Sequence, residues 1–266
     1  MSVLPDFEHH RPVAIEDALA LVNSDRVPYA GGTELLLAMR SGLIRPDALV
    51  DLKRIDALSN LVFDEGSIRI GGSVTHQAAA EDARVRAELP ALANVLDHVG
   101  NPRVRAVGTL GGNLCFAEPK SDVATVLEAL EAEVRLQSLR GNRTIPLSEF
   151  ILGPYTTARE PEELLTEITV PLRGDRAATY AKYQTMERPT VGVAGAITSS
   201  NGVRLVIGAV GPSPVTFDFA ELAEVEPVEV ASRIEVIPDM TGSEEYKRHI
   251  VAHYVRRVCE SLEIHA

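Results

Sequence analysis

Two glycine pairs are the residues of this sequence best suited to holding a ligand. One lies in residues 30–34, which read AGGTE, and the other in residues 109–113, which read TLGGN. Glycine has no Cβ atom, so its backbone can approach a ligand closely and its amides can form a nest for an anion such as phosphate. Gly31 and Gly111 are 80 positions apart. If both pairs serve one ligand, that ligand carries two linked phosphates.

The residues around the first pair predict a helix that begins just after the glycines. Residues 27–29 form a short apolar run typical of a strand, and residues 35–40, LLLAMR, read as the start of a helix. The first amides of a helix lack internal partners, and the helix dipole favours an anion there by about 0.3–1 kcal/mol. A tight turn is the alternative for an isolated Gly-Gly pair. Neither pair fits G-x-G-x-x-G or G-x-x-x-x-G-K-[ST].

No motif for catalysis or metal binding accompanies the glycine pairs. The sequence has no H-E-x-x-H, no G-x-S-x-G and no cluster of Cys and His. Its two cysteines, Cys115 and Cys259, cannot hold a four-cysteine iron–sulfur cluster, so any such cluster must belong to a partner. We expect a chain that binds a cofactor and has no catalytic residue or metal ligand of its own.

The composition is that of a globular protein with an acidic surface. Of 266 residues, 45% are hydrophobic and 24% are charged, and the formal net charge is -12. This charge argues against nucleic acid or an anionic membrane as the main ligand. The first residues lack the features of a signal peptide, and no apolar run is long enough to span a bilayer. We therefore expect a cytoplasmic protein.

The hydrophobic pattern up to residue 174 predicts alternating helices and strands. Helices are expected at 14–23, 34–41, 90–98 and 123–132, and strands at 27–30, 48–52, 67–74, 133–139, 143–147 and 164–170. The first elements form a βαβ unit, and residues 133–147 form a hairpin. The helix at 90–98 should lead into the second glycine loop. Another helix should open at Thr75-His76, where His76 is expected to be a cap or an exposed side chain, with contact to a cofactor as the alternative.

The remaining residues predict an antiparallel meander followed by helices. Residues 174–176, Gly-Asp-Arg, read as a linker, and strands are expected at 179–184, 191–198 and 203–210. Residues 223–236 suggest a short helix–turn–helix. The helix expected at 243–262 should bury an apolar stripe, whose members are Tyr246, Ile250, Tyr254, Val258 and Leu262.

Three motifs together resemble a known family. They are AGGTE at 30–34, TLGGN at 109–113 with the following Ser121-Asp122, and ELLTEITVP at 163–171. The chain resembles the FAD-binding medium subunit of molybdenum hydroxylases, a family that includes carbon monoxide dehydrogenase and xanthine dehydrogenase. The resemblance implies an α+β fold of the vanillyl-alcohol oxidase or PCMH type. It also implies an FAD-binding domain at 1–174, with subdomains at about 1–56 and 57–174, and a carbon monoxide dehydrogenase flavoprotein-like C-terminal domain at 175–266 with an antiparallel sheet and helices.

The same resemblance implies which residues contact FAD. The first loop would wrap the diphosphate with Pro28, Tyr29, Ala30, Gly31, Gly32, Thr33, Glu34 and Leu35. The second would add Thr109, Gly111, Gly112 and Asn113. Asp122 would meet the sugar, although a charge that favours a helix N-terminus is the alternative. Val99 and Leu165 would line the flavin or adenine, with core packing as the alternative, and Lys182 would lie near the isoalloxazine unless it is an ordinary solvated lysine. Residues 185–190, TMERPT, depart from the family pattern.

The function implied is electron transfer within a larger assembly. FAD would receive electrons from iron–sulfur clusters and pass them to an acceptor, because the flavin supplies the chemistry and the protein supplies orientation. The implied partners are a molybdopterin-binding large subunit and a [2Fe-2S] small subunit, in a heterotrimer or a dimer of heterotrimers. A self-contained flavin oxidase of the vanillyl-alcohol oxidase type and a structural subunit without cofactor are the alternatives.

Overall fold

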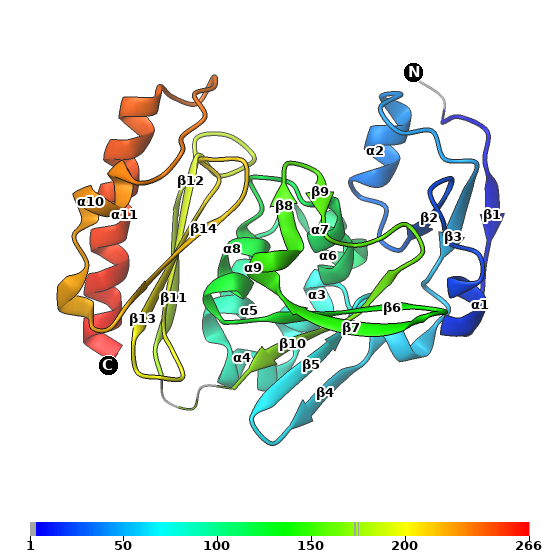
Figure 1. Ribbon diagram of the computed structural model, residues 1–266, viewed down its shortest axis with the longest axis horizontal. Coiled ribbons are helices and arrows are strands. Elements are labelled where there is room, and N and C mark those ends of the chain that lie inside the picture. Colours follow the sequence, from blue (N-terminus) through cyan, green and yellow to red (C-terminus); the bar gives the residue numbers. More distant parts are fainter. Residues whose placement is uncertain (1–3, 173, 175, 266) are drawn as a thin grey trace.

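The chain is built from three successive sheets, each with its own helices. The structure is a computed structural model that describes residues 4–172, 174 and 176–265. Figure 1 shows these sheets side by side along the longest axis, with the N-terminal sheet at one end and the C-terminal sheet at the other. Within the described ranges, no helix is long and apolar enough to cross a membrane.

The N-terminal sheet is parallel. Its strands are β1 (Glu8–His10), β2 (Arg26–Tyr29) and β3 (Ala48–Asp51), and its helices are α1 (Ile15–Leu19) and α2 (Leu35–Arg40). The strand order β1-β3-β2 confirms the βαβ unit, since β2 and β3 run parallel on either side of α2 in the sequence. Two details differ from the prediction. α1 is shorter than 14–23, and β1 was not predicted because EHH has no apolar alternation.

The central sheet is antiparallel and carries the largest core. Its strand order is β4-β5-β10-β6-β7. The strands are β4 (Leu61–Asp64), β5 (Ser67–Gly71), β6 (Glu133–Ser138), β7 (Gly141–Pro146) and β10 (Leu164–Pro171), and a separate small hairpin pairs β8 (Ile151–Gly153) with β9 (Thr156–Thr157). The helices are η1 (Asp56–Ser59), α3 (His76–Glu81), α4 (Ala83–Glu88), α5 (Pro90–Asp97), α6 (Pro102–Val107), α7 (Leu110–Phe116), α8 (Asp122–Ala129) and α9 (Leu147–Phe150). The predicted hairpin at 133–147 is confirmed by the pairing of β6 with β7.

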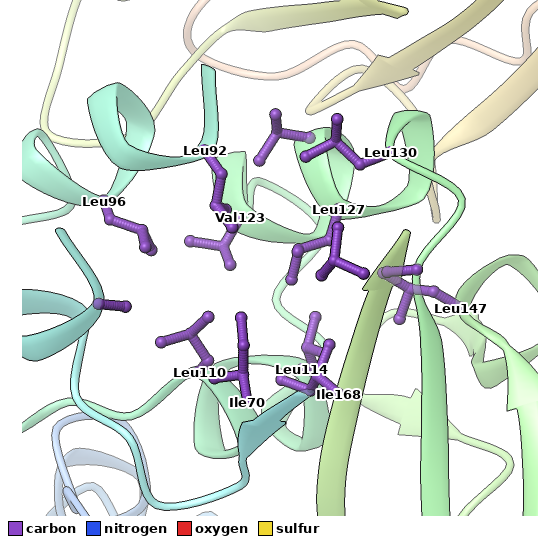
Figure 2. Close-up of a cluster of buried hydrophobic side chains, with 14 of the residues drawn as sticks. Ile70, Leu92, Leu96, Leu110, Leu114, Val123, Leu127, Leu130, Leu147 and Ile168 are labelled. Carbon is purple, nitrogen blue, oxygen red and sulfur yellow. The ribbon is translucent and has the colours of Figure 1, made fainter. Parts of the chain in front are cut away.

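Helices α5, α7 and α8 bury their apolar sides against β5 and β10. Figure 2 shows Leu92 and Leu96 of α5, Leu110 and Leu114 of α7, and Val123 and Leu127 of α8 facing Ile70 and Ile168 of the sheet. All of these side chains are almost fully buried. Burial of one such side chain stabilises the fold by roughly 1.5–3 kcal/mol. This core fixes the positions at which α7 and α8 begin, which are the positions of the second glycine pair and of Asp122.

The second glycine pair lies in the first turn of a helix, where the sequence suggested a loop, and the stretch 108–113 that includes it is still called the second glycine loop below. Gly111 and Gly112 occupy the first turn of α7, and the side chain of Thr109 caps that helix by accepting a hydrogen bond from the amide of Gly112 at 3.1 Å. α6, which was not predicted, separates α5 from α7. It has no buried residues, so hydrophobic periodicity gives no sign of it.

The C-terminal sheet is an antiparallel meander, as predicted. Its strands β11 (Ala178–Tyr183), β12 (Val191–Ile197), β13 (Val203–Gly208) and β14 (Val215–Phe219) pair in chain order. The fourth strand was not predicted. In place of the expected helix–turn–helix at 223–236 the chain forms η2 (Leu222–Glu224) and α10 (Pro227–Ser232), and it ends in α11 (Glu244–His265). Of the predicted linker, Asp175 lies outside the described residues, and Gly174 has a φ of 59°.

The apolar stripe on α11 differs from the prediction. Val258 and Leu262 are buried as expected, but Tyr246 is 40% exposed, and the apolar residues buried ahead of Val258 are Val251 and Val255. Helical geometry explains this difference. Each step of four residues turns about 40° beyond a full turn, so the side chains of Tyr246 and Leu262 point roughly 160° apart around the helix.

Candidate functional site

The first glycine loop has the strand–turn–helix form that its sequence predicts. Residues 28–35 run from the end of β2 through the turn to the start of α2, and all of them are half-buried. Gly32 has a φ of 68°, a conformation that non-glycine side chains rarely adopt. A Cβ atom on Gly31 would lie 2.7 Å from the Cα atom of Gly108. Glycine is therefore required at both positions, at Gly32 by its positive φ and at Gly31 by the close approach of Gly108.

The first loop presents a run of free backbone donors. Within the part of the chain that the structure describes, the amides of Gly31, Gly32, Thr33, Glu34 and Leu35 have no hydrogen-bond acceptor. Half-buried amides in such a run need partners, because an unsatisfied buried donor costs about 1–3 kcal/mol. Consecutive amides at a helix start are a fitting partner for the oxygens of a diphosphate.

The second glycine pair differs, because its amides already have partners. Leu110 donates to the carbonyl of Val74 at 3.0 Å, and Gly111 donates to the carbonyl of Gly72 at 3.2 Å. The amides of Gly112 and Asn113 are bonded to the side chain and the carbonyl of Thr109. The second pair therefore supplies a close backbone wall, and not the nest of exposed amides expected from the sequence.

Close backbone packing explains why glycines form this wall. A Cβ atom on Gly111 would lie 2.5 Å from the carbonyl oxygen of Gly72, and one on Gly72 would overlap the carbonyl of Leu165. Leu165 itself has its side chain in the central core. Since Gly31 packs against Gly108, the residue before Thr109, the two loops lie side by side, as a single ligand requires.

Asp122 is the first residue of α8 and is held by two side chains of β11. Its carboxylate accepts a hydrogen bond from the phenol of Tyr180 and one from Nζ of Lys182 at 2.7 Å. Burial, and then the Asp122 charge, raise the pKa of Tyr180 well above its ordinary value, so Tyr180 stays a donor. Ser121, which caps α8, donates to Oδ1 of Asn113 at 2.7 Å and so connects Asp122 to the second glycine loop.

Sequence reasoning placed Asp122 and Lys182 in different parts of the site and missed Tyr180. The structure joins all three around one cavity of about 200 Å³, which Asn94, Val95 and His98 of α5 and its C-terminal end complete. The sequence could have indicated Tyr180, because it lies two residues before Lys182 in a strand and therefore on the same face of that strand. A neighbouring cavity of about 470 Å³ shares Asn94 and Tyr180. Val99, predicted to line the ligand, is half-buried just beyond α5, and its carbonyl accepts from Arg105 at 3.2 Å.

The segment 185–190, between β11 and β12, reaches back to the first glycine loop and to the segment that follows α7. Arg188 contacts Oε1 of Glu34 at 2.8 Å and Oε2 of Glu118 at 3.2 Å. The phenol of Tyr155 also donates to Glu118, at 2.9 Å. Burial alone would lower the pKa of Arg188, but the carboxylates of Glu118 and Glu34 outweigh burial and raise that pKa. One arginine of the C-terminal sheet thus connects the loop before α2 to the loop after α7.

Cys115 is not placed for redox chemistry. Cys115 packs against the central core, and burial, opposed by the charge of Arg159, raises the pKa of its thiol to about 11. A thiol with this pKa is protonated near neutral pH and is a poor nucleophile. In the described ranges, no group of three His, Cys, Asp or Glu residues could hold a metal ion.

Comparison with known proteins identifies the family. Residues 5–173 match the family model described as the FAD binding domain in molybdopterin dehydrogenase. The nicotine 6-hydroxylase medium subunit of Paenarthrobacter nicotinovorans is 32% identical over 273 residues, which cover 96% of each chain. The carbon monoxide dehydrogenase medium chain of Hydrogenophaga pseudoflava is 29% identical over 274 residues, 95% of this chain and 96% of that one.

Solved structures agree with this assignment. A chain of carbon monoxide dehydrogenase from Hydrogenophaga pseudoflava superposes with a TM-score of 0.89 at 27% identity and 99% coverage of both chains. A chain of reconstituted CO dehydrogenase from Oligotropha carboxidovorans gives a TM-score of 0.90 at 26% identity, with 99% of this chain and 100% of that one covered. The mixed helix and sheet architecture is therefore that of these chains, and the protein belongs to the family of FAD-binding domains of molybdopterin dehydrogenases.

Proposed function

We propose that this chain is the FAD-carrying medium subunit of a molybdenum hydroxylase, and that it transfers electrons from iron–sulfur clusters of a partner to an external acceptor. The observation that carries the proposal is the run of unpartnered amides at 31–35 beside a second glycine loop, in a chain whose relatives are named medium subunits. When bound, FAD supplies the electron-transfer chemistry.

The residues of the first loop fit the diphosphate of FAD. The amides of residues 31–35 would donate to its oxygens, and Pro28, Tyr29 and Ala30 would form the strand end from which the loop departs. The packed backbone around Gly111 and Gly112 would exclude water from the other side. Charge-assisted hydrogen bonds from several amides are about twice as strong as neutral ones, so the net charge of -12 does not prevent binding of an anion.

Asp122 and Lys182 would contact the same end of the cofactor, because they are hydrogen-bonded to each other. We assign them to the isoalloxazine ring and the sugar chain next to it. Tyr180 holds one carboxylate oxygen of Asp122 and Lys182 holds the other, so the carboxylate is fixed in direction. The Lys182 cation would favour negative charge on the ring and so stabilise its reduced form.

The proposal extends to the division of the chain and to its partners. Residues 1–174 would be a PCMH-type FAD-binding domain, with subdomains at about 1–56 and 57–174, and residues 175–266 a carbon monoxide dehydrogenase flavoprotein-like C-terminal domain. The partners would be a molybdopterin-binding large subunit and a [2Fe-2S] small subunit, in a heterotrimer or a dimer of heterotrimers. The self-contained oxidase finds no support in the relatives named above, which are single subunits matched over nearly their whole length.

The purified chain tests this proposal directly. It should be yellow, release FAD and not FMN on denaturation, and oxidise no alcohol, aldehyde or aromatic substrate alone. Combined with the two partner subunits, it should show bleaching of its flavin absorbance when substrate is added. A colourless chain that cannot be reconstituted with FAD would refute the cofactor assignment, and turnover by the isolated flavoprotein would favour the oxidase.

A further inference from the structure

His98 brings an imidazole ring to the cavity that contains Asp122 and Lys182. It lies just after α5, is exposed to solvent, and lines the cavity of about 200 Å³ together with those two residues. His76, by contrast, is 3% exposed and lines neither this cavity nor its larger neighbour, which contradicts the expectation that His76 is a cap or an exposed side chain. A ligand in the cavity can therefore reach His98.

A hydrogen bond to its own helix decides which nitrogen of the His98 ring is available. Nδ1 of His98 lies 2.7 Å from the carbonyl oxygen of Asn94. A carbonyl oxygen can only accept, so Nδ1 carries a proton and donates this hydrogen bond. Nε2 has no hydrogen-bond partner in the described ranges. Nε2 is therefore the atom that can give a proton to a ligand when the ring is charged, and accept a hydrogen bond when the ring is neutral.

The other polar groups near Lys182 in this cavity are already bonded to one another. Tyr180 and Lys182 both donate to the carboxylate of Asp122. Burial, and then the Asp122 charge, raise the pKa of Tyr180 well above its ordinary value, so the phenol keeps its proton. Loss of a proton from Lys182 would leave the buried carboxylate of Asp122 without its cation. Histidine is the side chain that commonly gains and loses a proton near neutral pH.

The charges around His98 allow its ring to be protonated. Asp122, at the start of α8, favours a charged imidazole, whereas Lys182, on β11, opposes it, and these two charges are paired with each other. On α5 itself, Asp97 is paired with an arginine of α4. Arg105 of α6 donates to the two carbonyls that follow His98 in the chain. The C-terminal end of a helix favours a positive charge, and solvent can return a proton to an exposed ring.

We propose that His98 donates, from Nε2, the proton that the isoalloxazine ring takes up when FAD is reduced. This inference rests on the proposed function, which assigns that ring to the cavity of Asp122 and Lys182. Two electrons arrive from the iron–sulfur partner, the Nε2–H bond breaks, an N–H bond forms on the ring, and the imidazole becomes neutral. The reduced ring keeps one negative charge, which lies beside the Lys182 cation. Nε2 then accepts a hydrogen bond from the new N–H group until solvent returns a proton to it.

The rate of flavin reduction tests the proton transfer in the full, FAD-loaded chain. His98→Ala should slow the bleaching of flavin absorbance by dithionite about 100-fold, the lower end of the range for a general acid, because water can partly replace the ring. Free imidazole should restore much of this rate, since the substitution leaves room for it beside an open cavity. The wild-type rate should fall as pH rises from about 6 to 8, while the rate of His98→Ala stays nearly constant.

The reduction potential of the bound flavin tests the hydrogen bond. His98→Phe should shift the ratio of oxidised to reduced flavin about tenfold toward the oxidised form, which lowers the potential of a two-electron couple by about 30 mV. His98→Gln can still accept a hydrogen bond but cannot carry a proton, so its potential should stay closer to that of the wild type while its bleaching is slow. His249→Ala, at an exposed position of α11, is the matched control.

Two results would overturn the inference while the proposed function stands. One is a wild-type bleaching rate and potential in the His98 variants with FAD bound as in the wild type. The other is slow bleaching of His98→Ala that imidazole does not restore, because this would assign His98 a structural role. A wild-type chain that binds no FAD would refute the proposed function, and this inference with it.

Discussion

Arg188 should slow the release of FAD, because it joins the first glycine loop, which is proposed to bind the diphosphate, to the segment that follows α7. Its guanidinium contacts Glu34, in the first loop, and Glu118, which follows α7. Moving the first loop away from the end of α7 requires at least one of these ion pairs to break. Replacing Arg188 by Met keeps much of the side-chain volume and removes both pairs, so the dissociation rate of FAD should rise.

The size of the increase in the dissociation rate follows from the solvent exposure of the three charged side chains. The Arg188 side chain is 44% exposed, Glu34 is 32% exposed and Glu118 is 13% exposed. Ion pairs this accessible are screened by solvent, and each contributes about 0.2–1 kcal/mol. Two pairs give about 0.4–2 kcal/mol, which corresponds to a rate increase of roughly 2- to 30-fold. Salt should reproduce part of this increase in the wild type, because the screening length falls from about 10 Å at 0.1 M to about 3 Å at 1 M.

The assay dilutes the FAD-loaded chain and follows flavin fluorescence with time, at 0.1 M and 1 M salt. The Arg188→Met variant should release FAD faster and show little dependence on salt. Arg204→Met is the control, since it removes a comparable ion pair with Asp218 on strands β13 and β14, far along the chain from both glycine loops. Equal dissociation rates for wild type and Arg188→Met would refute the idea that this contact slows the release of FAD.

Two further predictions concern the glycines and His76. Gly111→Val and Gly32→Val should abolish FAD retention, the first because its side chain would meet the carbonyl of Gly72 and the second because of its positive φ. Circular dichroism should remain close to that of the wild type, and stoichiometric flavin in both variants would contradict the assignment. His76 has its pKa lowered from 6.5 to about 4 in the fold, so between these values the unfolded chain binds the extra proton. Stability should fall as pH falls from 6.5 to 4, by about 3 kcal/mol at most, and urea titrations of His76→Gln should show a smaller loss.

Sequence periodicity predicted the elements that have one apolar face. The helix α5 is of this kind, and the strands β11 to β13, which are rich in apolar residues, were also located to within a few residues. The pattern failed for elements whose stability comes from their neighbours. β1 is a short polar edge strand held by β3, and α6 is an exposed helix with no buried residue. In both, tertiary pairing outweighs local preference.

The sequence predicted which residues form the candidate site better than it predicted how these residues are arranged. Two glycine pairs suffice to suggest that their loops meet at one ligand, and Gly31 does pack against Gly108. The pairing of Asp122 with Lys182 and Tyr180 joins residues about 60 positions apart. No spacing rule connects a helix start to a strand of another sheet. The same limit applies to Arg188, whose partners Glu34 and Glu118 lie in two different loops.

The two glycine pairs show why a motif does not determine its own role. Both lie at the N-terminal end of a helix, the first in the turn before α2 and the second in the first turn of α7. The amides of Gly111 and Gly112 are bonded because Gly72 and Thr109 supply acceptors, whereas no acceptor lies against the amides of residues 31–35 in the described chain. Whether backbone amides stay free thus depends on whether a neighbouring segment presents acceptors to them. This is a property of the tertiary structure. A glycine pair in a sequence therefore predicts close approach of the backbone, and only the surrounding acceptors decide whether that backbone can also bind an anion.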